Sequence, residues 1–202
     1  MAEIDRRLKA PAQRQPSRLM TVSLITAAWG LWYAGYRAYY GFGGTDGMFG
    51  TPVSETQWRG INLAAAALLL GIAVLPVAVL PLWNMPRVRP ILLGLCWVLA
   101  VGFTMHALID DVQRVLSLAG VLQLDYPLFT TVNRRVADLQ DLLFNETWFL
   151  VEGVLWGVLG WINLGRSAAR RWWIGTEFAA IIVLTCFGLL AAFGVIGKTI
   201  IG

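Results

Sequence analysis

The sequence predicts an all-α membrane protein, a polytopic helix bundle with five transmembrane helices. Of its 202 residues, 57% are hydrophobic and only 14% are charged, and the mean hydropathy is +0.64. Soluble domains carry about 25% charged residues, so the chain is too apolar for that class. A bilayer core requires about 20 apolar residues per helix, and five stretches reach that length. The predicted transmembrane helices are residues 19–40, 61–83, 90–110, 147–164 and 174–196.

A basic tail, residues 1–18, precedes the first predicted helix. It is polar, and Pro11 and Pro16 disfavour a helix within it. No small-residue cleavage site follows, so we expect the first apolar stretch to be retained as a helix rather than removed as a signal peptide. Residues 19–202 show no domain boundary or repeat, and we expect them to form a single transmembrane bundle.

The Lys and Arg residues are unevenly distributed among the segments between the helices. Ten of the 16 lie in the tail and in the loops 84–90 and 165–173, whereas the other six are diluted by acidic residues. The positive-inside rule therefore predicts a cytoplasmic N-terminus and a C-terminus outside, with outer loops at 41–60 and 111–146. This sorting explains the net charge of +4 better than nucleic-acid binding does, so we expect no nucleic-acid partner.

The two outer loops differ in character. Residues 41–60 are rich in glycine and other turn formers. Within 111–146, apolar residues recur at helical spacing from Val132 to Leu143, with charged residues on the opposite side. This pattern predicts an amphipathic helix, which either lies on the outer membrane surface or covers the bundle as a lid.

Ionisable residues inside the predicted membrane helices are the main functional signal. His106 and Asp110 fall in the third helix, Glu152 in the fourth, and Arg37 at the end of the first. A charge near the centre of a membrane helix costs about 2.5–3.5 kcal/mol on insertion scales, so such residues usually have a function. With the predicted orientation, all four residues lie in the outer third of the membrane, which indicates one shared site.

Two carboxyl groups and an imidazole in an apolar pocket are suited to acid–base chemistry. We expect Asp110 and Glu152 to act as acid and base, and His106 to tune or relay the proton. Aromatic rings nearby would stabilise a carbocation, which favours isomerisation or cyclisation of an isoprenoid-like lipid. The residues expected to bind this substrate are Trp29, Tyr33, Tyr36, Arg37, Tyr40, Phe103, Trp148 and Trp156.

A structural role for the same residues is the alternative. Arg37 would then pair with Asp110 or Glu152 to hold the helices together, and the chain would be a non-enzymatic membrane subunit, chaperone or small carrier. Expected partners are therefore a lipophilic substrate, membrane lipid, and either a second copy or a membrane complex. One histidine and two separated cysteines form no haem or zinc pattern, so we expect neither a metal nor another cofactor.

Three motifs resemble a family of small actinobacterial integral membrane proteins of unknown function. They are YGFGGTDG at Tyr40–Gly47, HALID at His106–Asp110, and WFL at Trp148–Leu150. The resemblance covers most of residues 25–165. It implies a multi-pass protein of the bacterial plasma membrane and assigns no activity.

A shorter resemblance is to the sterol isomerase (emopamil-binding) family. It covers about two helices, with the segments LCW at 95–97, GF at 102–103, His106, Asp110, Glu152 and LWG at 155–157. Those enzymes protonate a sterol double bond and remove a proton elsewhere, and membrane-bound terpene cyclases use buried acids in a similar way. The resemblance implies the same roles for His106, Asp110 and Glu152. The chain departs from the family in having Asp rather than Glu after His106, and in an extra helix before the motif.

Overall fold

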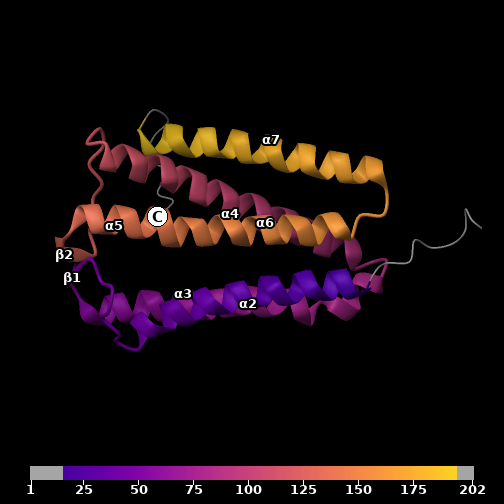
Figure 1. The fold of residues 1–202 in the computed structure, drawn as a ribbon, viewed down its shortest axis with the longest axis horizontal. Coiled ribbons are helices and arrows are strands. Elements are labelled where there is room, and N and C mark those ends of the chain that lie inside the picture. Colours follow the sequence, from indigo (N-terminus) through magenta and orange to yellow (C-terminus); the bar gives the residue numbers. More distant parts are fainter. Residues whose placement is uncertain (1–15, 195–202) are drawn as a thin grey trace, which may run out of the picture.

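The computed structural model describes residues 16–194 and is mainly helical (Figure 1). The long helices are α2 (Pro16–Gly41), α3 (Glu55–Ala78), α4 (Arg89–Leu118), α6 (Glu146–Ile162) and α7 (Ser167–Ala192). The shorter elements are the 3-10 helix η1 (Leu80–Asn84), the helix α5 (Arg134–Gln140), the π-helical turn η2 (Asp141–Asn145), and the strands β1 (Gly50–Pro52) and β2 (Phe129–Val132). Most of the predicted basic tail lies outside the described residues.

Four helical segments of the described chain are long and apolar enough to cross a membrane. They are α3, α4, the continuous segment Arg134–Ile162, and α7. This confirms a mainly helical chain and indicates a membrane protein. Helix α2 is as long as α7 but is not among the four; its second half is rich in tryptophan and tyrosine. A fifth crossing and the sides on which the termini lie stay predictions.

The five long helices run roughly along one axis (Figure 1). Helices α2 and α3 pack against each other along their length, and α4 packs in the same way against α6. Helix α7 lies along α4 on the side away from α2, and α2 contacts α6 to join the two groups. Strands β1 and β2 form an antiparallel ribbon at one end, with Gly50 opposite Val132 and Thr51 opposite Thr131. We call this end of the bundle, which also carries η2, the ribbon end.

The contact between α4 and α6 depends on a glycine. A Cβ atom on Gly153 would lie 2.4 Å from the hydroxyl oxygen of Thr104 and 3.0 Å from the carbonyl oxygen of Ala100. Such distances are shorter than van der Waals contact, and the second atom belongs to the backbone, which cannot easily move. The absence of a side chain at Gly153 therefore sets how closely the two helices approach.

We expect Gly153→Ala to lower the free energy of unfolding by about 1–3 kcal/mol, because overpacking forces the helices apart. Gly102→Ala is the matched control on α4, since its Cβ would meet no atom within 4 Å. There, the higher helix propensity of alanine should leave stability unchanged or raise it by up to about 1 kcal/mol. Unfolding of both variants in detergent measures the difference, and equal stabilities would contradict this account of the packing.

The segment 111–146, expected as an outer loop, is mostly helical. Helix α4 continues two turns beyond Asp110, to Leu118. Helix α5 is joined through η2 to α6, so the residues after Arg134 do not form a separate helix on the membrane surface or a lid. Arg114 on α4 pairs with Asp138 on α5 and with Asp141 on η2. This pairing of charges allows α4 to continue beyond Asp110, and the helix that contains α6 to begin before residue 147.

Three other predicted helix ends also move. The helix expected to begin at residue 61 begins at Glu55, because the side chain of Ser54 accepts a hydrogen bond from Gln57 N and caps it. The same helix ends at Ala78 rather than residue 83, and Trp83 lies in η1. Helix α7 begins at Ser167, seven residues before the predicted start at Ile174.

Candidate functional site

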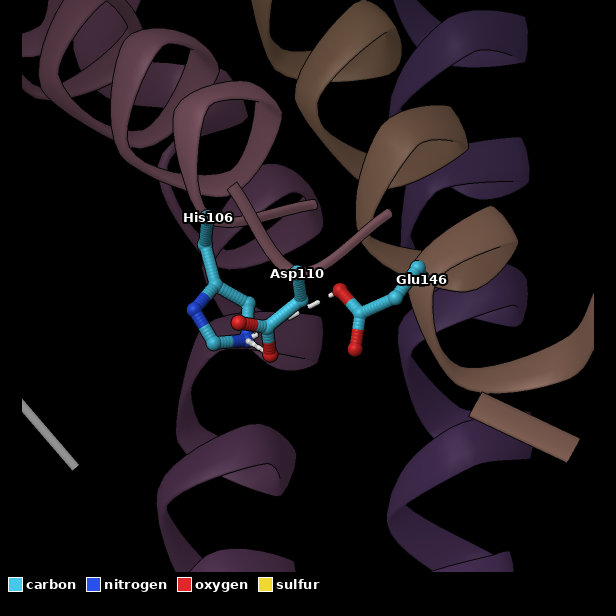
Figure 2. Close-up of side chains that lie close together, drawn as sticks. All are labelled: His106, Asp110 and Glu146. Atoms are coloured by element: carbon cyan, nitrogen blue, oxygen red, sulfur yellow. Dashed lines mark ion pairs between the residues drawn. The ribbon is translucent and has the colours of Figure 1, made fainter. Parts of the chain in front are cut away.

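The side chains of His106, Asp110 and Glu146 meet at the ribbon end of the bundle (Figure 2). His106 and Asp110 are one turn apart on α4, and Glu146 faces them from the start of α6. The distance from His106 Nε2 to Asp110 Oδ2 is 3.8 Å, and the distance from His106 Nε2 to Glu146 Oε2 is 3.9 Å. We call these three residues the acid–histidine cluster.

The acid–histidine cluster is buried at one side and open at the other. Glu146 is only 3% exposed, and its Oε2 atom has no hydrogen-bond partner among the described residues. Asp110 is partly exposed and accepts a hydrogen bond from Gln113 Nε2 at 3.2 Å. The side chain of His106 is 46% exposed and packs edge-on against the ring of Phe149. A molecule outside the bundle can therefore approach past His106, while Glu146 forms the floor.

A second polar group ties α4 to α5 and η2. Arg114 lies 3.3 Å from the carboxylate of Asp138 and 2.8 Å from that of Asp141. Both Ser117 and Tyr126 donate hydrogen bonds of 2.6 Å to Asp138. Burial, together with the hydrogen bond to Asp138, raises the pKa of the Tyr126 phenol above its ordinary value. In this Arg114 network, the carboxylates of Asp138 and Asp141 are therefore both paired with the Arg114 guanidinium. A buried or partly buried carboxylate that stabilises a fold needs such a partner.

The π-helical turn η2 explains why these acids face α4. In this turn, the backbone N–H of Glu146 bonds to the carbonyl of Asp141, five residues earlier, instead of four. Asp141 and Glu146 therefore come to the same side, where Asp141 meets Arg114 and Glu146 meets His106. Asn145 holds the turn by donating a 2.5 Å hydrogen bond to Asp141 and accepting one from Tyr33.

A cavity of about 150 Å³ lies near the Arg114 network, between α2, α3, the ribbon and η2. Its lining residues include Tyr36, Arg37, Tyr40, Asp141 and Asn145. Arg37 donates a hydrogen bond to Asn62, and Gln140 donates one to the Tyr36 hydroxyl. Pockets for drug-sized ligands are about 300–1,000 Å³, so this cavity accommodates a small polar group rather than a whole isoprenoid.

The three predicted catalytic residues are not all together in the structure. His106 and Asp110 are neighbours, as their spacing predicted. Glu152 lies outside the acid–histidine cluster: it is fully buried, and its Oε1 accepts a 2.8 Å hydrogen bond from Trp156 Nε1 on the same helix. Its place beside His106 and Asp110 is taken by Glu146.

The predicted substrate-binding residues divide into two groups. Those that line the cavity are Tyr36, Arg37 and Tyr40. The rest pack within the bundle: Trp29 and Trp148 exchange hydrogen bonds between each indole N–H and the other's backbone carbonyl, and Tyr33 stacks on Trp148 at 4.3 Å. Phe103 packs edge-on against Trp148, and Trp156 lies in an apolar cluster with Cys96 and Leu159.

The sequence pattern misses Glu146 and most of the Arg114 network, because it predicts an outer loop over residues 111–146. One signal was present. The segment from Asn133 to Glu152 contains no glycine or proline, and helical periodicity continues through it. Reading it as one helix would have placed Asp138, Asp141 and Glu146 beside the polar end of α4.

Comparison with known proteins adds no relative of this chain. A scan against protein-family models, a search of curated proteins and a search of solved structures each gave no match. The resemblances stated above therefore stay predictions, and the site has to be interpreted from its own geometry.

Proposed function

We propose that the chain is a membrane enzyme that isomerises or cyclises an isoprenoid-like lipid by proton transfer at the acid–histidine cluster. The observation that carries the proposal is the buried carboxyl group of Glu146. It has no hydrogen bond from the described residues at Oε2, and that atom faces an imidazole and is close to a second carboxyl group. Glu152 Oε2 and Glu177 Oε1 also have no partner among the described residues, so it is the position of Glu146 beside the imidazole and the second carboxyl group that singles it out.

Each member of the cluster has a role in this proposal. Protonated Glu146 gives its proton to one carbon of a double bond, which leaves a carbocation. Asp110 takes a proton from a neighbouring carbon, and the shifted double bond is the product. His106 lies 3.8–3.9 Å from a carboxylate oxygen of each acid and returns the proton from Asp110 to Glu146. Phe149, at 4.5 Å from the imidazole, would face the carbocation with its π electrons.

Substrate access follows from the exposure of the cluster. With a cytoplasmic N-terminus, the ribbon end lies on the outer side of a bacterial plasma membrane. His106 is open to the surroundings of the bundle, so a lipid can reach the cluster from the side without entering the small cavity. The cavity, with Arg37 at its wall, then accommodates a polar group rather than the reacting chain.

A non-enzymatic membrane subunit is the second candidate, and the Arg114 network favours it. That network is partly buried, with Asp138 at its buried centre, and it is internally paired and joins α4 to η2 and to Tyr126. Polar residues of this kind lock helices together. In this case, Glu146 and His106 would be the edge of a structural polar layer.

Mass spectrometry of copurifying lipids distinguishes the two candidates. We expect wild type and Glu146→Gln to copurify with the same isoprenoid skeleton, with the variant enriched in the unconverted form and melting close to wild type. Glu152→Gln is the matched control, because it makes the same change on the same helix away from the cluster. Only bulk phospholipid in both samples, together with a destabilised Glu146→Gln, would favour the subunit.

A further inference from the structure

We infer that His106, Asp110 and Glu146 bind a divalent first-row transition cation, such as Mn²⁺ or Zn²⁺. This differs from the expectation that the chain holds no metal. Its binding follows from the residues alone and goes beyond the proposed function. The ion would bind deprotonated Glu146 and Asp110 and His106 Nε2, so the cluster transfers protons only when the ion is absent. The three side chains converge from two helices on one point, as Figure 2 shows.

The donor atoms have the chemistry and spacing of a metal site. One imidazole nitrogen and two carboxylate oxygens lie within 4.8 Å of one another. Around a tetrahedral ion with bonds of about 2.0–2.2 Å, two ligand atoms are about 3.3–3.6 Å apart. The distances of 3.8 and 3.9 Å from His106 Nε2 would therefore shorten by a few tenths of an ångström, and the distance between the two carboxylate oxygens, which is at most 4.8 Å, would shorten by up to about 1.5 Å. The imidazole favours Zn²⁺ over an all-oxygen ion such as Ca²⁺, and the two carboxylates also suit Mn²⁺.

An unpartnered buried oxygen points into the cluster. Glu146 Oε2 is buried and has no hydrogen-bond partner among residues 16–194, yet it faces His106 Nε2. A buried carboxylate without a partner loses hydration without compensation, so a structure that keeps one requires an explanation. A cation bonded to this oxygen provides it.

The surrounding charge also favours a cation. Within the described chain, Asp110, Asp111 and Glu146 form no ion pair with Lys or Arg at 4 Å or less. Arg114 is nearby, but it is paired with the two acids of its own network. Gln113 donates to Asp110 Oδ1 and leaves Oδ2 directed at His106, an arrangement typical of residues that orient a metal ligand.

Titration with Mn²⁺ tests the inference. The full chain is purified in detergent and treated with a chelator, and free Mn²⁺ is then measured by electron paramagnetic resonance. We expect about one Mn²⁺ per wild-type chain, displaced by Zn²⁺. Glu146→Gln and His106→Gln should each weaken binding at least about tenfold, and Glu152→Gln should bind as wild type does. The imidazole is half exposed, so His106→Gln tests the site with little change in packing.

Identical titrations of wild type, Glu146→Gln and His106→Gln would overturn the inference. The outcome is separable from that of the proposed function, because binding is measured without a substrate. If one Mn²⁺ binds at the cluster and the chelator-treated, metal-free protein converts no isoprenoid, the cation site stands and the proposed function fails. If protein that binds no Mn²⁺ converts isoprenoid, the proposed function stands and the cation site fails.

Discussion

Arg114→Met is expected to lower the free energy of unfolding by about 3–5 kcal/mol, because removing one partner leaves buried charges without compensation. Arg114 bonds with both Asp138 and Asp141, and Asp138 is almost fully buried. Methionine retains most of the length of the side chain, so lost packing contributes little. Equilibrium unfolding in detergent, followed by tryptophan fluorescence, measures the change.

Arg59→Met is the control for loss of an arginine. Its partner Glu55 is 3.3 Å away, but both side chains are exposed, so the expected cost is about 0–1 kcal/mol. Combining Arg114→Met with Asp141→Asn should recover part of the loss, because one uncompensated charge is removed. If Arg114→Met is as mild as Arg59→Met, the network does not hold α4 and η2 together.

The long helices were predictable because their interiors are apolar, and the physics of the bilayer requires long apolar runs. Their ends are harder to predict, since an apolar run stops at the first charged residues whether or not the helix does. Helix α4 passes Arg114 because its charge is paired across to α5 and η2. Whether a charge ends a helix depends on a partner distant in the sequence, which local patterns do not reveal.

The candidate site was predictable only in part, for a similar reason. The i, i+4 spacing of His106 and Asp110 was enough to place them together. Glu146 joins them through the π turn, whose extra residue rotates the start of α6, and no periodicity of 3.6 residues predicts that rotation. The indole that donates a hydrogen bond to Glu152 belongs to Trp156, four residues later on the same helix. The i, i+4 spacing therefore predicts this contact from the sequence.

Glu146→Gln should lower the rate of proton transfer to an isoprenoid by about 10²–10⁴-fold, which is the usual contribution of a general acid or base. Each tenfold loss corresponds to about 1.4 kcal/mol of barrier. Proton transfer to carbon in D₂O leaves deuterium in the lipid, so the assay does not require the product to be known. Protein in liposomes is supplied with squalene, farnesol and a polyprenol, and deuterium incorporation is followed by mass spectrometry.

The comparison with Glu152→Gln determines which acid is used. Glu152 is fully buried and bonded to Trp156, away from His106, so its amide variant should retain exchange within a few-fold of wild type. The opposite ranking, with exchange lost in Glu152→Gln and kept in Glu146→Gln, would return the acid role to Glu152. It would also require the bundle to open between α4 and α6, because Glu152 has no exposed surface in this structure. The two carboxyl groups therefore imply different routes for the lipid, one past His106 and one between the helices.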